Sequence, residues 1–338
     1  MDKGPALIGL RQENFGIKGD GRLPLFSLIA DNMSTVDQRL KDALEQHNPV
    51  VRQVSDYLQE ASGKRLRPAL VLLAGQVGER RHLSFDLVNV AAAVEMIHMA
   101  TLVHDDIIDK ADMRRGMPAV RSRFSDPVAV LSGDFLFARA FQILASTRRP
   151  ELVDLAAEVV YVMSTGEISQ HLDQGRIASE EAYWRRIEAK TGFFLETCCR
   201  LGATATCAPS AVQEGLARYG HHIGLAYQVI DDLLDWVADP DVLGKAVGED
   251  LAAGIYTLPI IHALEDADYG QELRDLLANS IVPGDVRRLV VASGAIDYCR
   301  MRAQEHLQQA GRALEDVPAG PERDELAQVA DFIGTRDH

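Results

Sequence analysis

The apolar residues of this 338-residue chain recur mostly at spacings of three and four, the period of a helix with one buried face. The pattern begins at about Leu25, just after Pro24, and continues to about Ile333 with proline and glycine interruptions. No stretch shows a convincing period-two strand series or a regular alternation of strands with helices. The chain is therefore predicted to be all-α, with residues 1–22 as a loose N-terminal arm and residues 23–338 as one helical domain.

Two of the predicted helices are long and strongly apolar. The first runs from about Asp86 to Lys110, and the second runs from about Leu216 to Val237. After the second helix, Gly248 and Gly254 disfavour helix and predict a long loop, Ala246–Tyr256.

Both long helices end in the same acidic pattern. Asp105 and Asp109 lie one turn apart and share a helix face, while Asp106 flanks them about 100° round the axis. The same spacing recurs 126 positions later in a second triplet, Asp231, Asp232 and Asp235. Carboxylates this close repel one another unless cations compensate their charge. Two identical triplets on apolar helices therefore predict a single site that both helices form.

The net charge, the cysteines and the apolar runs limit the partners and the location that the sequence allows. Fifty acidic against 35 basic residues give a net charge of −15, which argues against nucleic acid and shows no basic patch for a membrane. The four cysteines lack metal-ligand spacing and are typical of a reduced, cytoplasmic protein. No signal peptide opens the sequence, and the apolar runs Ala69–Ala74 and Val88–Val94 are too short to span a bilayer. A soluble protein without a transmembrane segment is expected.

Basic residues flank the first triplet. They occupy a predicted turn before the helix and the segment just after it: Lys64, Arg65, Arg67, Arg114 and Arg115. Such clusters are often solvated turns or simple ion pairs, but in an acidic protein they also suit an anion site. His98 lies two turns before Asp105 on the same face, where a lone histidine is more often a core residue than a ligand.

Magnesium is the cation that six aspartates suit best. It binds through one or two carboxylates, keeps several waters and shares oxygens with substrate phosphates. Zinc would require histidine or cysteine, a di-iron site would require Glu-x-x-His pairs, and a calcium loop is not a helix. The residues thus predict a diphosphate held through Mg²⁺ at the end of an apolar helical tunnel, where the metal would also stabilise a departing diphosphate.

From about Gly63 to Pro259 the chain resembles the trans-polyprenyl diphosphate synthases. The two acidic triplets match the two DDxxD motifs of that family, and Ser62–Pro68 matches GGKRxRP with serine for the first glycine. Further matches to ExxH, RR, KT, YQ and GKxxGxDL are Glu95 with His98, Arg114-Arg115, Lys190-Thr191, Tyr227-Gln228, and Gly244-Lys245 with Gly248, Asp250 and Leu251.

The resemblance implies a magnesium-dependent prenyltransferase that condenses isopentenyl diphosphate with an allylic diphosphate, such as farnesyl or geranylgeranyl diphosphate. The allylic carbon–oxygen bond would ionise, the isopentenyl double bond would attack, and a proton would leave. The implied metal ligands are Asp105, Asp109 and Asp231, with Asp106, Asp232 and Asp235 acting partly through water. The implied allylic diphosphate contacts are Arg114, Lys190, Thr191, Gln228 and Lys245, and those of isopentenyl diphosphate are Lys64, Arg67, His98 and Arg115. The implied catalytic set is Asp105, Asp106, Asp109, Lys190 and Asp231.

Two positions bear on the product. Ile255 stands where many members of the family have a lysine, so one contact with the allylic diphosphate is missing. Thr101 and Ala100, one turn before Asp105, are small where short-chain members carry an aromatic ring. The resemblance therefore implies an open tunnel and a long product, a quinone side-chain precursor of about six to ten isoprene units.

Several alternatives remain at this level. The chain could be a catalytic subunit that requires a second, different chain, or a shorter-chain geranylgeranyl or farnesyl synthase; a homodimer is the default assembly. A terpene cyclase would carry a different second metal motif. A non-catalytic partner subunit would have lost the acidic and basic motifs, which are intact here.

Overall fold

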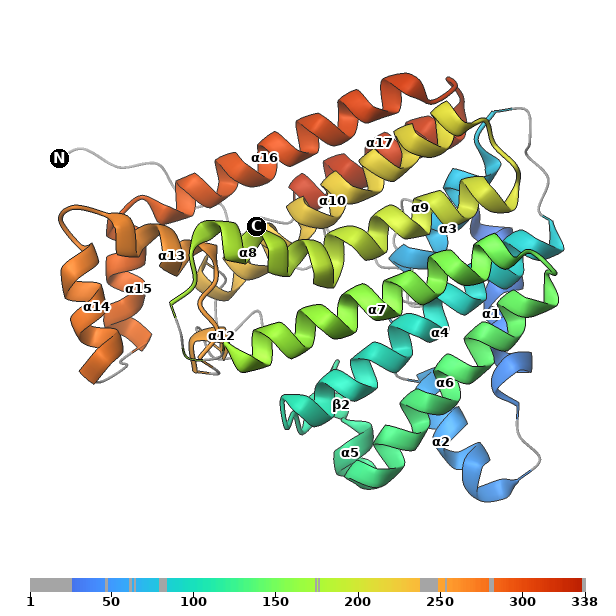
Figure 1. Ribbon diagram of the computed structural model, residues 1–338, viewed down its shortest axis with the longest axis horizontal. Coiled ribbons are helices and arrows are strands. Elements are labelled where there is room, and N and C mark those ends of the chain that lie inside the picture. The colour runs from blue at the N-terminus through green and yellow to red at the C-terminus, as the bar shows by residue number, and fades with distance from the viewer. Residues whose placement is uncertain are drawn as a thin grey trace, which may run out of the picture.

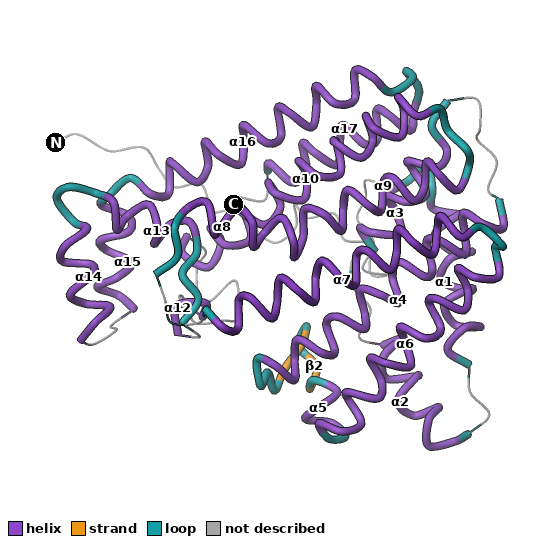
Figure 2. Tube along the Cα trace, in the orientation of Figure 1, coloured by secondary structure: helices purple, strands orange, loops and turns teal. Residues whose placement is uncertain are grey.

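The computed structural model describes residues 26–45, 48–60, 63, 65–78, 84–173, 175, 177–237, 249–252, 254–279 and 283–335. Within these ranges helices dominate, so the all-α prediction is confirmed (Figures 1 and 2). The helices are α1 (Ala30–Leu44), α2 (Pro49–Glu60), α3 (Leu66–Gln76), α4 (Phe85–Ile108), α5 (Val120–Arg123), α6 (Asp126–Ser146), α7 (Pro150–Leu172), α8 (Glu180–Ile187), α9 (Phe193–Ala205), α10 (Ser210–Val237), α12 (Glu249–Ala252), α13 (Leu258–Glu265), α14 (Gly270–Asn279), α15 (Pro283–Ala292), α16 (Ala295–Ala313) and α17 (Pro321–Gly334). The predicted arm at residues 1–22 lies outside the described residues.

Helix α4 is the centre of the bundle. It begins at Phe85, where the Ser84 hydroxyl group accepts a hydrogen bond from the Leu87 backbone N–H at 3.0 Å. It packs against α1, α3 and α6, and nearly all of its residues before Thr101 are buried. A helix that is apolar on every face is stable only when other helices surround it. The first acidic triplet is therefore carried at the end of a fixed core element.

Two described helices, α4 and α6, are long and apolar enough to cross a membrane by length and composition alone. The core helix of a folded bundle passes the same test, and 78% of the apolar window of α4 is buried by neighbouring helices. The corresponding figure for α6 is 39%, so much of that helix faces outward.

Glycines allow α9 to approach its neighbours closely. A Cβ atom at Gly202 would lie 2.2 Å from the carbonyl oxygen of Val71 on α3. A Cβ atom at Gly224 on α10 would lie 2.8 Å from the Cα atom of Gly192. Both distances are far below van der Waals contact, so only glycine fits. These crossings bring α10, which carries the second acidic triplet, against the start of α9.

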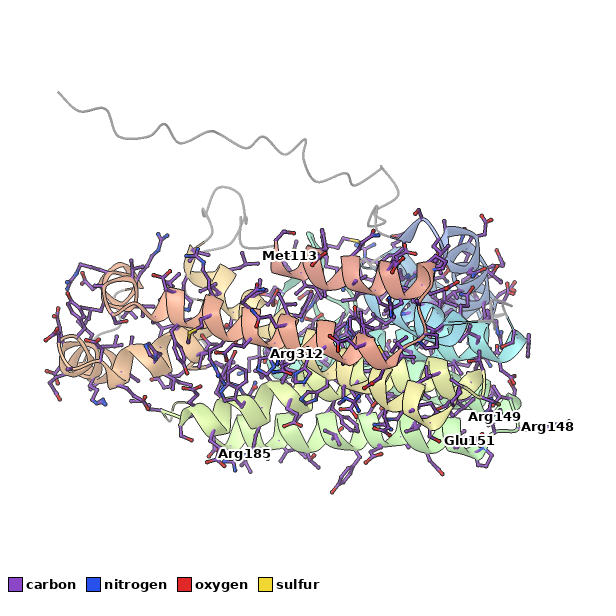
Figure 3. All side chains as sticks on the ribbon, turned by 90° about the horizontal axis from the view of Figure 1, so that it is seen from above. Met113, Arg148, Arg149, Glu151, Arg185 and Arg312 are labelled. Atoms are coloured by element: carbon purple, nitrogen blue, oxygen red, sulfur yellow. The ribbon has the colours of Figure 1, made fainter. Side chains whose placement is uncertain are left out.

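The first turns of α7 and the end of α9 are tied together by an arginine. The guanidinium group of Arg149 donates to the carbonyl oxygens of Ala205 at 2.7 Å and Thr204 at 2.8 Å, and it pairs with Glu151 at 2.9 Å. Figure 3 shows Arg149 and Glu151 at one end of the molecule. The arginine satisfies carbonyl groups that the end of α9 leaves without helical partners. It thereby holds α7 alongside α9.

Two sequence predictions are wrong in detail. A short antiparallel ribbon, β1 (Met113–Arg114) with β2 (Met117–Pro118), follows α4 where no strand was expected. Its turn places Arg115 and Gly116 at φ values of 53° and 77°, and a two-residue pairing is too short to show a period of two. The predicted loop Ala246–Tyr256 contains the short helix α12.

Candidate active site

A cavity of about 590 Å³ lies between α3, α4, α7, α10 and the junction of α8 with α9. It brings together ten residues predicted from the sequence: Arg67, His98, Thr101, Asp105, Arg114, Arg115, Lys190, Thr191, Gln228 and Asp231. Lys64 and Lys245 lie outside the described residues. The predicted convergence of both acidic helices on one cavity is thus observed through Asp105 and Asp231.

Asp105 lines the cavity, and Asp109 lies exposed one turn beyond it. Burial raises the pKa of Asp105 to about 6, although the ammonium group of Lys190 opposes the shift. Burial also raises the pKa of Asp109, again against the effect of Lys190. Partly desolvated carboxylates of this kind gain most from a cation bound directly beside them.

Asp106 turns away from this pair and is 3% exposed. Its Oδ1 atom accepts hydrogen bonds from Nε of Arg114, at 2.8 Å, and from Nη2 of the same arginine. The pairing locks the β-ribbon onto the end of α4. It also means that Arg114 reaches the cavity with part of its guanidinium group already bound to protein.

A π-helical turn, η3 (Glu188–Gly192), joins α8 to α9 and carries Lys190 and Thr191. Such turns accommodate one extra residue and are frequent at functional sites. Lys190 Nζ lies 2.9 Å from Oε1 of Glu167 on α7. Glu167 was not predicted as a site residue. Its neighbour Gly166 shows how closely α7 approaches the turn, because a Cβ atom there would lie 2.8 Å from the Cβ atom of Ala189.

The polar wall beside Lys190 is a continuous hydrogen-bond chain. Thr191 Oγ1 donates to Gln228 Oε1 at 2.8 Å, and Gln228 Nε2 donates to Asp232 Oδ1 at 2.7 Å. The other oxygen of Asp232, Oδ2, accepts from the hydroxyl group of Tyr183 at 2.9 Å. Tyr183 on α8 is a second residue that sequence reasoning missed, since it lies 49 positions from its partner.

The opposite wall is basic. Arg67 Nη1 lies 3.2 Å from Nε2 of His98, and its guanidinium carbon lies 4.8 Å from the ring centroid of Phe194. Burial and the charge of Arg67 hold the pKa of His98 well below its usual value, so the ring is neutral and accepts from the arginine. Arg65 also lines the cavity and forms a buried ion pair with Glu95, at 2.7 Å.

The first two carboxylates of the second triplet have different surroundings. Asp231 is exposed and lines the cavity, whereas Asp232 is buried in the chain of hydrogen bonds described above. Burial and the charges of Asp235 and Asp231 raise the pKa of a further carboxyl group, Asp250, to about 6. Asp250 therefore lies within electrostatic reach of the triplet.

The donors at the cavity fit a hard divalent cation. Asp105 and Asp231 supply only carboxylate oxygens, the ligand type that Mg²⁺ prefers. Among the described residues, no three His, Cys, Asp or Glu side chains converge closely enough to hold an ion by themselves. That arrangement suits a metal whose remaining ligands are waters and the phosphate oxygens of a substrate.

Two predicted specificity positions have different surroundings. Thr101 lines the cavity, as does Met163 on α7, but Ala100 is fully buried and does not line it. Ile255 lies beside a separate cavity of about 420 Å³ between α7 and α8. The residue after it, Tyr256, accepts a hydrogen bond through its carbonyl oxygen from Arg186 at 3.1 Å.

Comparisons with known proteins agree with this geometry. Residues 48–291 match the family model described as polyprenyl synthetase. The heptaprenyl diphosphate synthase component 2 of Geobacillus stearothermophilus is 34% identical over 325 residues, covering 93% of this chain and 98% of the relative. The octaprenyl diphosphate synthase of Escherichia coli is 35% identical over 320 residues, covering 92% and 97%. A crystal structure of polyprenyl synthase from Caulobacter crescentus, complexed with calcium and isoprenyl diphosphate, matches with a TM-score of 0.85 and 31% identity, covering 93% of this chain and 97% of that one.

Proposed function

Because this chain belongs to the polyprenyl synthetase family and is a prenyl-transferring enzyme, we propose that it condenses isopentenyl diphosphate with an allylic diphosphate. The primer is farnesyl or geranylgeranyl diphosphate, and the product is a long all-trans polyprenyl diphosphate that serves as a quinone side-chain precursor. The relatives at 34% and 35% identity carry heptaprenyl and octaprenyl diphosphate synthase in their names, which supports a long product.

One observation carries the proposal: a single cavity is lined by acidic residues from two helices and by two sets of basic or polar residues from different elements. Lys190 and Thr191 come from the π-helical turn, and Arg67 and His98 come from α3 and α4. Two diphosphates would therefore bind through different donors, and the apolar residues Leu66, Leu102 and Met163 line the same cavity. Holding both reactants in one orientation removes most of the entropic barrier to condensation.

Magnesium is the proposed metal, and Asp105, Asp109 and Asp231 are its proposed carboxylate ligands. When bound, it supplies Lewis-acid stabilisation of the charge on the departing diphosphate. Lys190 contributes a positive charge at the same place, and Arg67 with neutral His98 donates to the second diphosphate. The crystallised complex of the Caulobacter enzyme contains calcium, which also binds oxygen ligands.

A chain-elongation assay on the purified protein tests this function. The protein is supplied with Mg²⁺, farnesyl diphosphate and isopentenyl diphosphate, and dephosphorylated products are sized by mass spectrometry. A ladder that ends beyond geranylgeranyl length is expected. Termination at three or four isoprene units would favour a shorter-chain synthase. Absence of product from folded protein would favour a catalytic subunit that needs another chain.

We propose a homodimer that pairs through α6 and α7. On α7, Tyr161, Ile168 and Leu172 recur at helical spacing and are 61–73% exposed, and Leu131 of α6 is 66% exposed. Large apolar side chains in such a strip favour burial against another chain. The "component 2" in the name of the Geobacillus relative makes a different second subunit the alternative. Sedimentation velocity decides: wild type should sediment as a dimer, Ile168→Glu as a monomer, and a monomeric wild type would contradict homodimerisation.

We also place the enzyme in the cytoplasm. The four cysteines are free in the structure, which fits a reducing compartment. Cell fractionation tests this location, with the enzyme expected in the high-speed supernatant and recovery in the membrane pellet as the contrary result.

A further inference from the structure

Both side-chain oxygens of Asp232 accept hydrogen bonds from other residues of the protein. It is 6% exposed, accepts from Gln228 through Oδ1 and accepts from Tyr183 through Oδ2. Asp231, the preceding residue, is exposed and lines the cavity. The two neighbouring carboxylates therefore have different surroundings, as in the first triplet, where Asp105 lines the cavity and Asp106 is buried against Arg114.

The hydrogen bonds at Asp232 fix the direction of the whole chain. Asp232 accepts in both of its hydrogen bonds, so the group of Gln228 that faces it is the amide NH₂. The amide oxygen of Gln228 must then face Thr191, which donates to it at 2.8 Å. Reversing the amide would place two acceptors together at Asp232. Asp232 thus determines which polar atoms of the cavity wall remain for a ligand.

Tyr183 is held firmly on the far side of Asp232. Its side chain is completely buried, its ring meets that of Trp184 edge-on at 5.4 Å, and the guanidinium carbon of Arg186 lies 5.4 Å from its centroid. Because packing of the ring fixes the position of the Tyr183 hydroxyl group, the hydrogen bond from that group fixes the orientation of the Asp232 side chain. Tyr183 is not among the residues that line the cavity.

We propose that Tyr183 is a positioning residue, whose hydroxyl group holds Asp232 away from the metal ions. Through Asp232, it orients Gln228 and Thr191 toward the allylic diphosphate. This inference rests on the proposed function of the cavity. It leaves Asp231 as the metal-binding carboxylate that the second triplet presents to the cavity, and it gives Asp232 a different task.

The variant Tyr183→Phe removes the hydroxyl group and keeps the ring. Tyr219→Phe is the matched control, because Tyr219 is equally buried on α10 and its hydroxyl group donates to the Leu326 carbonyl oxygen at 2.6 Å, away from the cavity. Isothermal titration calorimetry measures the binding of inorganic diphosphate with Mg²⁺ to each protein. Steady-state assays give the KM values for farnesyl and isopentenyl diphosphate and the half-saturating concentration of Mg²⁺.

For Tyr183→Phe we expect diphosphate binding about fivefold weaker, as is typical for loss of one hydrogen bond that orders a binding group. The KM for farnesyl diphosphate should rise by a similar factor, while the KM for isopentenyl diphosphate and the Mg²⁺ requirement stay unchanged. Tyr219→Phe should match wild type in every binding and kinetic value. Adding Tyr183→Phe to Gln228→Ala should weaken binding no further, because both changes interrupt one chain.

Wild-type diphosphate affinity in Tyr183→Phe would overturn the inference, as would an additive double variant or a higher Mg²⁺ requirement. If Tyr183→Phe does not fold, Asp232→Asn decides: weaker diphosphate binding at an unchanged Mg²⁺ requirement supports positioning, and a raised requirement makes Asp232 a metal ligand. Failure of wild type to elongate any primer would contradict the proposed function instead. The calorimetric comparison still decides the role of Tyr183 in that case.

Discussion

Addition of a methyl group at Gly63 should weaken the use of one substrate without lowering the stability of the fold. A Cβ atom there would lie 2.3 Å from Nη1 and 2.5 Å from Cζ of Arg115, whereas ordinary contact begins at 3.4 Å. The guanidinium group must therefore retreat by about 1 Å in Gly63→Ala, and displacements of that size cost up to about 10²-fold in rate. The moving group is the end of a flexible side chain, so unfolding free energy should change by less than about 1 kcal/mol.

The expected result is a fall of about 10–100-fold in kcat/KM for isopentenyl diphosphate, equivalent to about 1.4–2.8 kcal/mol of transition-state stabilisation. The KM for the allylic primer should stay close to wild type, because its proposed contacts Lys190, Thr191 and Gln228 lie on other elements than Arg115. Elongation kinetics with each substrate varied in turn measure both values, and urea unfolding measures stability.

Gly311→Ala is the control for an added methyl group. A Cβ atom at Gly311 meets nothing within 4 Å on the exposed face of α16, so kinetics should not change and stability should rise by about 0.5–1 kcal/mol. If Gly63→Ala kept its kcat/KM for isopentenyl diphosphate within twofold, Arg115 would not hold that substrate from its observed position.

Three further outcomes are expected. Gly202→Ala should lower the urea midpoint by an amount equivalent to about 1–3 kcal/mol or more, because the new Cβ atom would lie 2.2 Å from the backbone oxygen of Val71; an unchanged midpoint contradicts the close crossing. Burial raises the pKa of Asp105 to about 6, and Mg²⁺ binds only the ionised carboxylate. The half-saturating Mg²⁺ concentration should therefore be constant above pH 6 and rise by up to about tenfold per pH unit below it. Mg²⁺ titrations of activity between pH 5 and 8 measure this dependence. Lys190→Met leaves Glu167 without its ammonium partner beside Asp105 and Asp109, so the KM for farnesyl diphosphate should rise about tenfold or more. The KM for isopentenyl diphosphate should not change. Equal increases in both KM values would argue against separate binding sites for the two diphosphates.

The features that the sequence predicts well are those set by local spacing. The shared face of Asp105 and Asp109 follows from the helical period, and the apolar residues before them fix that face against the core. The convergence of Asp105 with Asp231 in one cavity followed from the repetition of the pattern together with the need to compensate its charge.

The features that the sequence could not supply are partner choices across the fold. Nothing in the spacing shows that Asp106 pairs with Arg114 or that Asp232 is held by Tyr183, because each choice depends on how separate elements pack. Glu167 was overlooked for the same reason, as its partner Lys190 lies on another helix. Identical acidic triplets therefore acquire different partners for their middle residues from tertiary surroundings alone.

The π-helical turn Glu188–Gly192 makes the site sensitive to chain length more than to residue identity. One surplus residue in a single turn sets the phase between α8, which carries Tyr183, and α9, which packs on α3 and α10. Deletion of one residue from this turn would restore the regular α-helical hydrogen-bond pattern, and Lys190 would rotate relative to either α8 or α9. Substitutions elsewhere on α9 cannot repair such a shift, since the glycine crossings fix its register. Evolutionary drift in this enzyme should therefore allow many replacements around the turn and hardly any insertion or deletion within it.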